Sequence, residues 1–408
     1  MKKIVITGMG AVTPVGIGVD EYWKNIIAGK SGIDTIKSFD PSGLAVQFAG
    51  EIKDFDPTEY LPKDLVRKTD PFMQYAYIAA QEAIKQSGIE IEPERTGIVM
   101  GTAMAGVSTT AFTQDALSGA HKKVGPRFIP KILGNIAAAN IAIDYNMQGP
   151  SFTVSTACSS GGDAINIACT YMKAGKADVM LAVGAESVLC PLVIDSLANA
   201  KALSRRNDDP KSSSRPFDIS RDGFVIGEGG GALVLETEEH AKARGAKIYG
   251  EIAGCGNTCD AHHVTAPHPE GRGAMACIRQ AVAEAGIELK DIGYINAHGT
   301  ATHKGDLVET AAIKEIFGEH LPYVSSTKGA TGHMMGAGGI TETIACIKAI
   351  ETGVLPPTIN LSEVDPECAG IDFVANTAKK ADLRYAMSNA FGFGGQNSSV
   401  LIGKYIGG

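Results

Sequence analysis

Short apolar runs alternate with longer amphipathic runs along most of the chain. Apolar runs of strand length predict buried β-strands at residues 3–7, 97–100, 151–154 and 179–183. Longer runs predict helices at residues 71–86, 161–173 and 274–285. This alternation is typical of an α/β fold in which helices cover the sheets. The polar stretch at residues 204–215 predicts a surface loop.

Two parts of the sequence echo each other. "GGDAINIAC" begins at Gly161, and "GGITETIAC" begins at Gly338. A second echo pairs "GFVIGEGGGALVL" from Gly223 with "GFGGQNSSVLI" from Gly392. One echo could arise by chance, because helices rich in small residues resemble one another. Two echoes in the same order indicate a duplicated α/β unit. We therefore predict an N-terminal half, residues 1–250, and a C-terminal half, residues 251–408, with a site where they meet.

Composition narrows the class of protein. The chain has 408 residues, 44% of them hydrophobic and 20% charged, as in an ordinary globular enzyme. A net charge of −8 argues against nucleic-acid binding by the whole chain, although local basic patches can still act. The eight cysteines are scattered without the density of a disulfide scaffold. No apolar run reaches membrane-spanning length, and no signal-peptide cleavage site follows the first strand. We expect a cytoplasmic protein.

Cys158 stands at an unusual place, in the segment "TVSTACSSGGDA". It lies between a predicted strand that ends near Thr156 and a predicted helix that begins around residues 159–162. The positive end of that helix would favour the reactive thiolate. The small neighbours leave room for an acyl group, as in the strand–nucleophile–helix turn of acyl-transfer enzymes. The alternative, a buried cysteine packed as a small hydrophobe, is our interpretation of Cys169, Cys190, Cys277 and Cys346.

Two histidines follow apolar runs in loops rich in small residues. His298 lies in "YINAHGTATHKGD", and His333 lies in "SSTKGATGHMMGAGG". Such loops present polar groups at the carboxyl edge of a sheet. Two other motifs give weaker signals. The Cys255–His263 run "CGNTCDAHH" imitates zinc spacing but has no second ligand pair. "GMGAVTPVG" begins like a dinucleotide fingerprint, but Thr13 replaces its third glycine.

Four motifs in order give the chain a family resemblance. They are "TACSSG", "NAHGTAT" followed by "GD", "STKGATGH" followed by "MGAGG", and "FGFGGQN". With them, essentially the whole chain resembles the β-ketoacyl-[acyl-carrier-protein] synthases of the thiolase superfamily. The resemblance implies a thiolase-like fold with α-β-α-β-α layers. It also implies a homodimeric acyltransferase that condenses malonyl units with acyl chains in fatty-acid biosynthesis, working with acyl carrier protein and no cofactor.

The resemblance also implies roles for individual residues. Cys158 would carry the acyl chain as a thioester, while His298 and His333 would promote decarboxylation of the malonyl thioester. The backbone N–H groups of Cys158 and Phe393 would hold the tetrahedral oxyanion, and the Phe393 ring would act as a gate for the acyl chain. Lys328 would act electrostatically, tied to the carboxylates of Asp306 and Glu309.

Three further groups are implied in the same way. Hydrogen bonds to the pantetheine arm would come from Thr265, Thr300 and Thr302. A basic patch for the acidic carrier protein would comprise Lys63, Arg67, Lys68 and Arg206. A structural monovalent cation would be held by Asn296, Glu342, Ser388 and Asn389. The sequence departs from the family pattern at Thr302-His303-Lys304, where many relatives carry Thr-Pro, and this affects loop stiffness.

Other functions on the same fold make distinct predictions. A ketosynthase of a dissociated polyketide pathway would share the whole constellation, so this alternative stays open. A thiolase would need a second cysteine near the C-terminus, where this chain has Phe393. A chain-length-determining partner subunit would lack the nucleophile, whereas Cys158 is present. Acyl-chain length preference is not fixed by these motifs.

Overall fold

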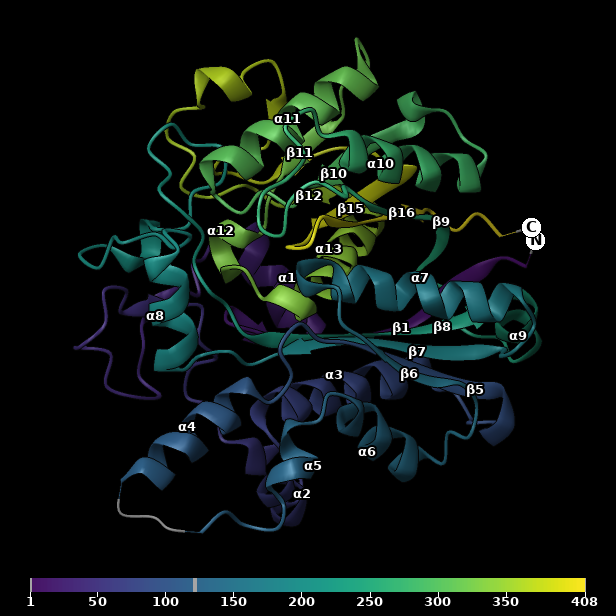
Figure 1. Ribbon diagram of the computed structural model, residues 1–408. Coiled ribbons are helices and arrows are strands. Elements are labelled where there is room, and N and C mark those ends of the chain that lie inside the picture. Colours follow the sequence, from purple (N-terminus) through teal and green to yellow (C-terminus); the bar gives the residue numbers. More distant parts are fainter. Residues whose placement is uncertain (1, 120–122, 408) are drawn as a thin grey trace.

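The computed structural model describes residues 2–119 and 123–407. Layers of helices and sheets alternate through the molecule (Figure 1). The outer helices of one side are α3 (Pro71–Ser87) and α6 (Asn135–Tyr145), and those of the other side are α10 (Arg272–Ala285) and α11 (His303–Phe317). Between the two sheet layers lie α7 (Ser160–Lys173) and α13 (Gly338–Thr352). The expected α-β-α-β-α arrangement is confirmed.

Further helices and short strands complete the fold. The other helices are α1 (Val19–Ile27), α2 (Lys63–Lys68), α4 (Val107–Ser118), α5 (Phe128–Ile132), α8 (Pro191–Asn199), α9 (Glu238–Ala243) and α12 (Lys328–Thr331). The short strands are β2 (Gly16–Ile17), β3 (Asp34–Thr35), β4 (Phe48–Ala49), β12 (Val354–Leu355), β13 (Asp372–Phe373) and β14 (Lys379–Lys380).

The main strands repeat one topology. The first set is β1 (Ile4–Thr13), β5 (Thr96–Gly101), β6 (Ser151–Val154), β7 (Val179–Glu186) and β8 (Gly229–Thr237). The second set is β9 (Gly250–Cys259), β10 (Ile292–Asn296), β11 (Tyr323–Ser325), β15 (Tyr385–Phe391) and β16 (Gln396–Gly403). The spatial order β6-β5-β7-β8-β1 is matched by β11-β10-β15-β16-β9. Equivalent neighbours share the same parallel or antiparallel sense, so the predicted duplication is confirmed.

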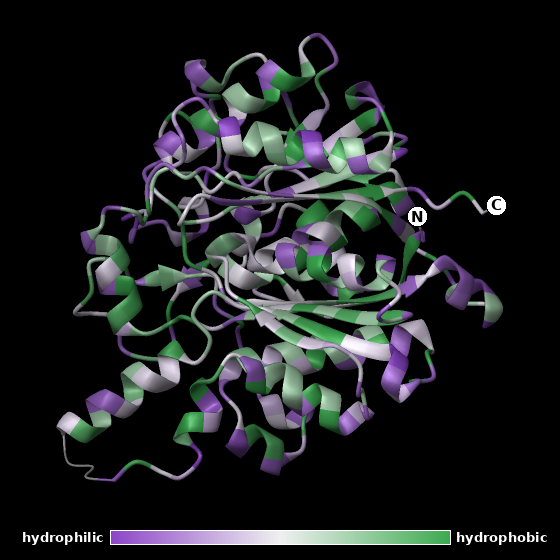
Figure 2. Cartoon of the chain, turned by 45° about the vertical axis from the view of Figure 1, so that its right-hand side comes forward, coloured by the Kyte–Doolittle hydropathy of each residue, from purple (hydrophilic) through white to green (hydrophobic). Residues whose placement is uncertain are grey.

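The two sets join into one continuous ladder, because β1 pairs with β9 through Ile4 and Ile252. Every residue of β7 and β8 is buried. Strands covered on both faces are apolar throughout, and Figure 2 shows the hydrophobic residues concentrated along the sheets and on the helix faces that cover them. Among the described residues, no helix has the length and apolar character needed to cross a membrane.

The predicted strands and helices all form, with one difference in burial. The run at 151–154 is an edge strand rather than a buried one, because β6 lies at the end of the sheet and Phe152 is 39% exposed.

The glycines that imitate a dinucleotide fingerprint have a packing role. Gly8 and Gly10 lie inside β1, where a Cβ would lie 2.1 Å from the carbonyl oxygen of Ala83 and 1.9 Å from that of Ala79. These glycines therefore allow α3 to approach the strand.

The repeated glycine pairs have a similar explanation. A Cβ on Gly161 would lie 2.7 Å from the oxygen of Gly336, and a Cβ on Gly339 would lie 2.4 Å from the nitrogen of Gly162. The N-terminal turns of α7 and α13 therefore approach each other backbone to backbone. This close approach joins the two halves at the place where the candidate residues lie.

Candidate active site

Cys158 lies in a short turn between β6 and α7. The turn, Ala157–Ser159, is a single turn of 3-10 helix, and Ala157 has a left-handed φ of 50°. Small hydroxyl residues hold it in place: Ser159 donates to the Thr156 oxygen at 2.7 Å, and Ser160 donates to the Ala157 oxygen at 2.7 Å. The predicted strand–nucleophile–helix corner is therefore present, with α7 beginning at Ser160.

The protonation state of Cys158 differs from our expectation. We expected the helix to favour the thiolate, but burial raises the pKa of Cys158 to about 11. The backbone N–H of Phe393 and the charge of Lys328 act in the opposite direction and do not outweigh burial. At neutral pH the resting sulfur is a thiol, and it must lose its proton when it attacks.

The two histidines converge on this sulfur from the second half. The His298 and His333 rings meet edge to face, with centroids 5.4 Å apart and an interplanar angle of 88°. One ring nitrogen of each histidine and the Cys158 sulfur all lie within 4.8 Å of one another. Burial and the nearby Lys328 charge lower the pKa of both rings well below the usual value for histidine. Both imidazoles are therefore neutral, and each carries one N–H donor and one acceptor.

The polar atoms of these rings are available to a ligand. Three buried ring nitrogens have no hydrogen-bond partner within the described structure. They are Nδ1 of His298 and both nitrogens of His333. Aromatic side chains fix the rings instead: Phe224 packs edge-on against His333, and Phe391 lies 5.9 Å from His298 between ring centroids. Unpaired buried polar atoms are costly, so their presence indicates a site built to receive polar groups.

Two buried carboxylates hold the His298 loop. Glu309 on α11 accepts hydrogen bonds from the backbone N–H groups of His298 and Gly299, both at 2.8 Å. Asp306 accepts from the backbone N–H groups of Phe217 at 2.7 Å and Ala301 at 3.2 Å. Burial raises the pKa of Glu309 to about 7 and that of Asp306 to about 6. These residues orient the loop through its backbone.

Lys328 has a different partner from the one we expected. Its ammonium is buried and forms an ion pair with Glu342 on α13, not with Asp306 or Glu309. Its charge opposes the rise that burial causes in the pKa of Glu309, and it adds to burial in lowering the pKa of both histidines. The physical reason is position: Lys328 opens α12 and its ammonium reaches Glu342 on α13, while the two other carboxylates accept hydrogen bonds from the backbone of the His298 loop.

A cavity of about 550 Å³ joins the predicted residues. Its lining includes Cys158, His298, His333, Thr265, Thr300, Thr302 and Phe393. The Phe393 side chain is 42% exposed, and Gly394 and Gly395 after it have positive φ angles of 89° and 74°. A Cβ on the preceding Gly392 would lie 3.2 Å from the Cys158 nitrogen, so the Phe393 loop runs directly against the nucleophile turn.

The other cysteines behave as expected. Cys169, Cys190, Cys277 and Cys346 are at most 1% exposed and pack in the core. Among the described residues, the Cys255–His263 run does not bring its cysteines and histidines together: Cys255 contacts Cys169, while Cys259 donates to the Gly394 oxygen. The zinc interpretation is therefore excluded for this run.

Comparison with known proteins agrees with this geometry. Residues 1–241 match the family model "Beta-ketoacyl synthase, N-terminal domain", and residues 249–362 match "Beta-ketoacyl synthase, C-terminal domain". The chain belongs to the β-ketoacyl synthase family. The chain is 43% identical to 3-oxoacyl-[acyl-carrier-protein] synthase 2 of Vibrio harveyi, over 99% of each chain.

Solved structures of ketosynthases also resemble this chain. A β-ketoacyl synthase from Burkholderia phymatum superposes with a TM-score of 0.91 at 35% identity, covering 100% of both chains. A type II polyketide ketosynthase, solved with its acyl-carrier protein and bound to the hexaketide, also gives 0.91 at 32% identity, covering 99% of this chain and 100% of that one.

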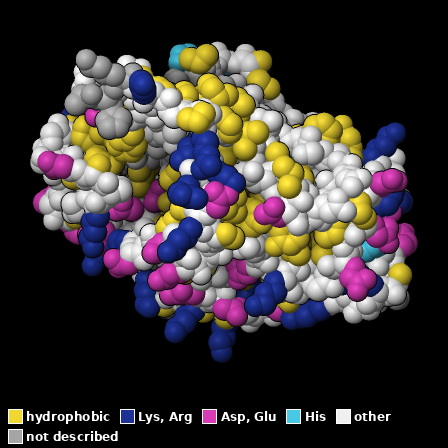
Figure 3. Space-filling view, turned by 90° about the horizontal axis from the view of Figure 1, so that it is seen from below, with side chains coloured by type: hydrophobic (Ala, Val, Ile, Leu, Met, Phe, Trp, Pro, Cys, Tyr) yellow, Lys and Arg dark blue, Asp and Glu magenta, His cyan; other side chains and the backbone are white. Residues whose placement is uncertain are grey.

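The expected basic patch lies mostly on α2. Lys63, Arg67 and Lys68 are exposed there, and Asp64 pairs with the last two. Arg206 lies in the loop after α8, partly buried, and donates to the Ser220 oxygen at 2.5 Å. Seen from below, Lys and Arg side chains gather beside a hollow with hydrophobic walls (Figure 3).

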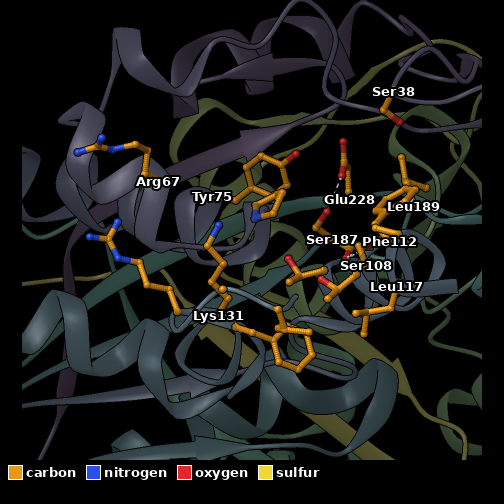
Figure 4. A pocket seen from close by; sticks show the side chains of 18 of the residues that line it. Ser38, Arg67, Tyr75, Ser108, Phe112, Leu117, Lys131, Ser187, Leu189 and Glu228 are labelled. Atoms are coloured by element: carbon orange, nitrogen blue, oxygen red, sulfur yellow. Dashed lines mark hydrogen bonds between the residues drawn. The ribbon is translucent and has the colours of Figure 1, made fainter. Parts of the chain in front are cut away.

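That hollow has a volume of about 950 Å³ and is separate from the Cys158 cavity. Figure 4 shows Arg67 and Lys131 on one side of it, and Leu117 and Leu189 on the other. Arg127 lines it too and lies close enough to lower the pKa of Asp64. Sequence reasoning did not single out Arg127 and Lys131, because they share a hollow with Arg67 of α2 only in the tertiary structure.

The four residues expected to hold a monovalent cation include atoms that fit one. Asn296 Oδ1 and Glu342 Oε2 are buried and have no hydrogen-bond partner within the described structure. Asn389 accepts from Ser399 at 2.8 Å, and Ser388 is buried on the same strand. Hard oxygen ligands of this kind suit an alkali cation, which would also give a partner to the Glu342 oxygen Oε2, since Lys328 bonds Oε1.

Proposed function

We propose that this chain catalyses the decarboxylative condensation of malonyl-[acyl-carrier-protein] with an acyl group carried on Cys158, giving β-ketoacyl-[acyl-carrier-protein] in fatty-acid elongation. The observation that carries the proposal is the convergence of one thiol and two neutral imidazoles in one cavity. The similarity to 3-oxoacyl-[acyl-carrier-protein] synthase 2 of Vibrio harveyi, over nearly the full length of both chains, supports it.

The first step is acyl transfer to Cys158. The sulfur attacks the acyl thioester carbonyl, its proton passes to an adjacent neutral imidazole, and the carrier thiol leaves with a proton. A new S–C bond replaces the old one, so no oxidant or cofactor is consumed. The tetrahedral oxyanion would be held by the N–H groups of Cys158 and Phe393, which already lie next to the sulfur.

The second step is decarboxylation. The malonyl thioester loses CO₂, and the electron pair of the broken C–C bond forms an enolate whose oxygen needs donors held in place beforehand. Neutral His298 and His333 can each donate an N–H to that oxygen. Lys328 supports this neutral state, because its charge lowers the pKa of both rings.

The third step forms the new C–C bond. The enolate carbon attacks the acyl–Cys158 thioester, the C–S bond breaks, and the sulfur leaves as a thiolate that takes up one proton. The product is β-ketoacyl thioester, and the resting thiol is restored. The high pKa of buried Cys158 favours that final protonation.

Substrate binding follows from the cavity lining. We propose that Thr265, Thr300 and Thr302 hydrogen-bond the pantetheine arm, and that Phe393 moves as the acyl chain enters. The exposed cations of α2 would attract the acidic carrier protein, with Arg206 contributing from its loop. The monovalent cation, if bound, would lie between Asn296, Glu342, Ser388 and Asn389 and stabilise α13 against the Lys328 loop.

The assembly and setting are also proposals. We propose a homodimer in which edge strand β6 pairs with its copy, because Phe152 and Ile143 leave exposed apolar surface at this edge, 39% and 74% exposed. We assign residues 1–250 and 251–408 to the two halves of the duplicated fold. The absence of disulfides among the eight cysteines supports a cytoplasmic setting.

The alternative is a ketosynthase of a dissociated polyketide pathway. It is favoured by one observation, the structural similarity to the type II polyketide ketosynthase described above. The two functions differ in what happens to the β-keto group between condensations. A chain that accepts saturated acyl-carrier thioesters and rejects poly-β-keto thioesters is an elongating fatty-acid enzyme, and the reverse preference identifies the polyketide enzyme.

The test is direct. The purified protein is incubated with an acyl-carrier thioester, and the mass of the Cys158 peptide is measured before and after malonyl-carrier thioester is added. We expect a mass gain equal to the acyl group, which disappears as β-ketoacyl-carrier product and CO₂ form. A folded protein whose Cys158 gains no mass would contradict the proposal. Competition among acyl chains of different lengths then defines the preferred substrate.

A further inference from the structure

Glu186 is a buried carboxylate that none of the proposed steps uses. It ends β7 in the first half and is 0% exposed. Its Oε1 accepts from the hydroxyl of Thr102 and the N–H of Met104, both at 3.0 Å. Its Oε2 accepts from the N–H of Ala103 at 2.6 Å and from the N–H of Gly336 at 3.1 Å. One side chain therefore ties a turn of the first half to the His333 loop of the second.

Both turns are strained and border the Cys158 cavity. Ala105 and Met335 have left-handed φ angles of 48° and 46°. Side chains with a Cβ rarely adopt this region unless the surrounding structure compels them. Met104 and Met335 each line the cavity beside Cys158. Glu186 accepts four hydrogen bonds from these two turns. Other bonds support them: Ala105 donates to the Thr102 hydroxyl at 3.2 Å, and the His333 backbone bonds Val225 at 2.7 Å and Gly227 at 2.9 Å.

The His333 loop is also wedged against the first half at this point. A Cβ on Gly336 would lie 2.8 Å from Glu186 Oε2 and 2.8 Å from the Cα of Thr102. A Cβ on Gly161 or on Gly184 would lie only 2.7 Å from the Gly336 carbonyl oxygen, so these glycines allow that oxygen to approach. The loop is therefore packed tightly against the first half. The bond from Gly336 to Glu186 adds to the backbone bonds of His333 with Val225 and Gly227 in opposing movement away from it.

We infer that Glu186 is a positioning residue for the condensation: it clamps the Ala103–Met104 turn and the His333 loop together, and so fixes the distance between the Cys158 sulfur and the His333 imidazole. The kinetic consequence rests on the function proposed above. Glu186 also acts on Cys158 electrostatically, because its negative charge opposes ionisation of the thiol. Among the described residues, the ionisable groups around that sulfur are Glu186, Lys328, His298 and His333.

Two substitutions separate the clamp from the charge. Glu186→Gln removes the charge and places an NH₂ group opposite two of the four donors, so the charge is lost and the clamp is weakened. Glu186→Asp keeps the charge but is too short to reach both turns. Glu236→Gln is the matched control, because Glu236 is also 0% exposed but bonds Arg244, His240 and Thr7, away from the Cys158 cavity.

The first measurement needs no substrate: the rate of Cys158 alkylation by iodoacetamide is followed against pH. We expect the Glu186→Gln profile to shift to lower pH by roughly 0.5 to 1 unit, while Glu186→Asp and Glu236→Gln follow the wild type. The second measurement is condensation, where we expect kcat to fall about ten- to a hundredfold in both Glu186 variants with little change in KM.

The outcomes are distinct. Wild-type kcat in Glu186→Asp, or an unshifted alkylation profile in folded Glu186→Gln, would overturn the inference. Equal losses in Glu236→Gln would show a general effect of removing a buried carboxylate, and would overturn it too. If the wild type itself fails to condense the carrier substrates, the proposed function is wrong, and the alkylation profile still decides whether Glu186 acts on Cys158.

Discussion

The two halves share one strand topology but carry different reactive side chains. In each half a turn follows the second strand, and a buried carboxylate accepts two of its backbone N–H groups. In the second half Glu309 holds His298 and Gly299, and in the first half Glu186 holds Ala103 and Met104. The equivalent turns are thus held in the same way, by a buried carboxylate that accepts backbone hydrogen bonds. They differ in chemistry, since only the turn of the second half carries an imidazole, that of His298.

The difference lies in how each carboxylate is placed. Glu309 comes from helix α11 and bonds within its own half, whereas Glu186 ends strand β7 and also reaches Gly336 across the join. The first half supplies the sulfur and the crossing clamp, and the second supplies both imidazoles and the Lys328–Glu342 ion pair. Duplication therefore provides two scaffolds, and specialisation places complementary groups on each.

The largest expected effect comes from removing the contribution of the first half. Cys158→Ala leaves the frame intact but deletes the atom that carries the acyl chain. We expect acyl loading and condensation to fall by more than about a thousandfold, because Cys158 is the one thiol among the described residues that line the cavity. Loading is measured by peptide mass and condensation by product formation. A variant that keeps a tenth of wild-type condensation would show that another residue is the nucleophile.

The next effect concerns the ion pair of the second half. Lys328→Met leaves Glu342 buried without its partner, which costs about 3–5 kcal/mol of stability. The double variant Lys328→Met, Glu342→Leu removes both charges and should regain most of that loss. Urea denaturation of the three proteins measures both values. If the single variant is as stable as the double, the ion pair does not compensate a buried charge.

A smaller effect is expected where the halves touch. Gly339→Ala places a Cβ 2.4 Å from the Gly162 nitrogen, so the two central helices must separate. We expect a loss of about 1–3 kcal/mol in unfolding free energy. Gly43→Ala is the control, because a Cβ there meets nothing within 4 Å. Equal stability of the two variants would mean that the helices do not need this close approach.

The last prediction is a pH dependence. Burial raises the pKa of Glu309 to about 7 from an ordinary value of 4.5. Because the folded pKa is the higher one, its contribution to stability is full below pH 4.5 and is lost as the pH rises through 7. We expect wild type to lose stability relative to Glu309→Gln over this range. Urea midpoints at pH 4.5, 6 and 8 test this, and a constant difference would contradict the pKa shift.

Much of this comparison could be predicted from the sequence. The echo of Gly161 and Gly338 marked the paired central helices, because close helix contact demands glycine in both copies. The loops of His298 and His333 were visible because small residues surround each histidine after an apolar run. The edge position of β6 was not predictable, since a strand that ends a sheet looks like a buried one when its partner strands are unknown.

Partners and protonation states could not be predicted either. Lys328 pairs with Glu342. Nothing in the spacing of the sequence shows that Lys328 would choose this carboxylate over Asp306 or Glu309. The thiol state of Cys158 depends on how completely the fold excludes water, which outweighs the helix end that the sequence revealed. The role of Glu186 could not be predicted from the sequence, because its four hydrogen-bond partners come from two segments that are far apart in the chain.

The central claim is that the sulfur of one half and the imidazoles of the other divide the reaction between them. The most direct test is a single turnover of His298→Ala that follows acyl transfer to Cys158 and CO₂ release from the malonyl thioester in the same sample. We expect Cys158 still to acquire the acyl group while CO₂ release is abolished. Release of CO₂ at the wild-type rate would contradict it.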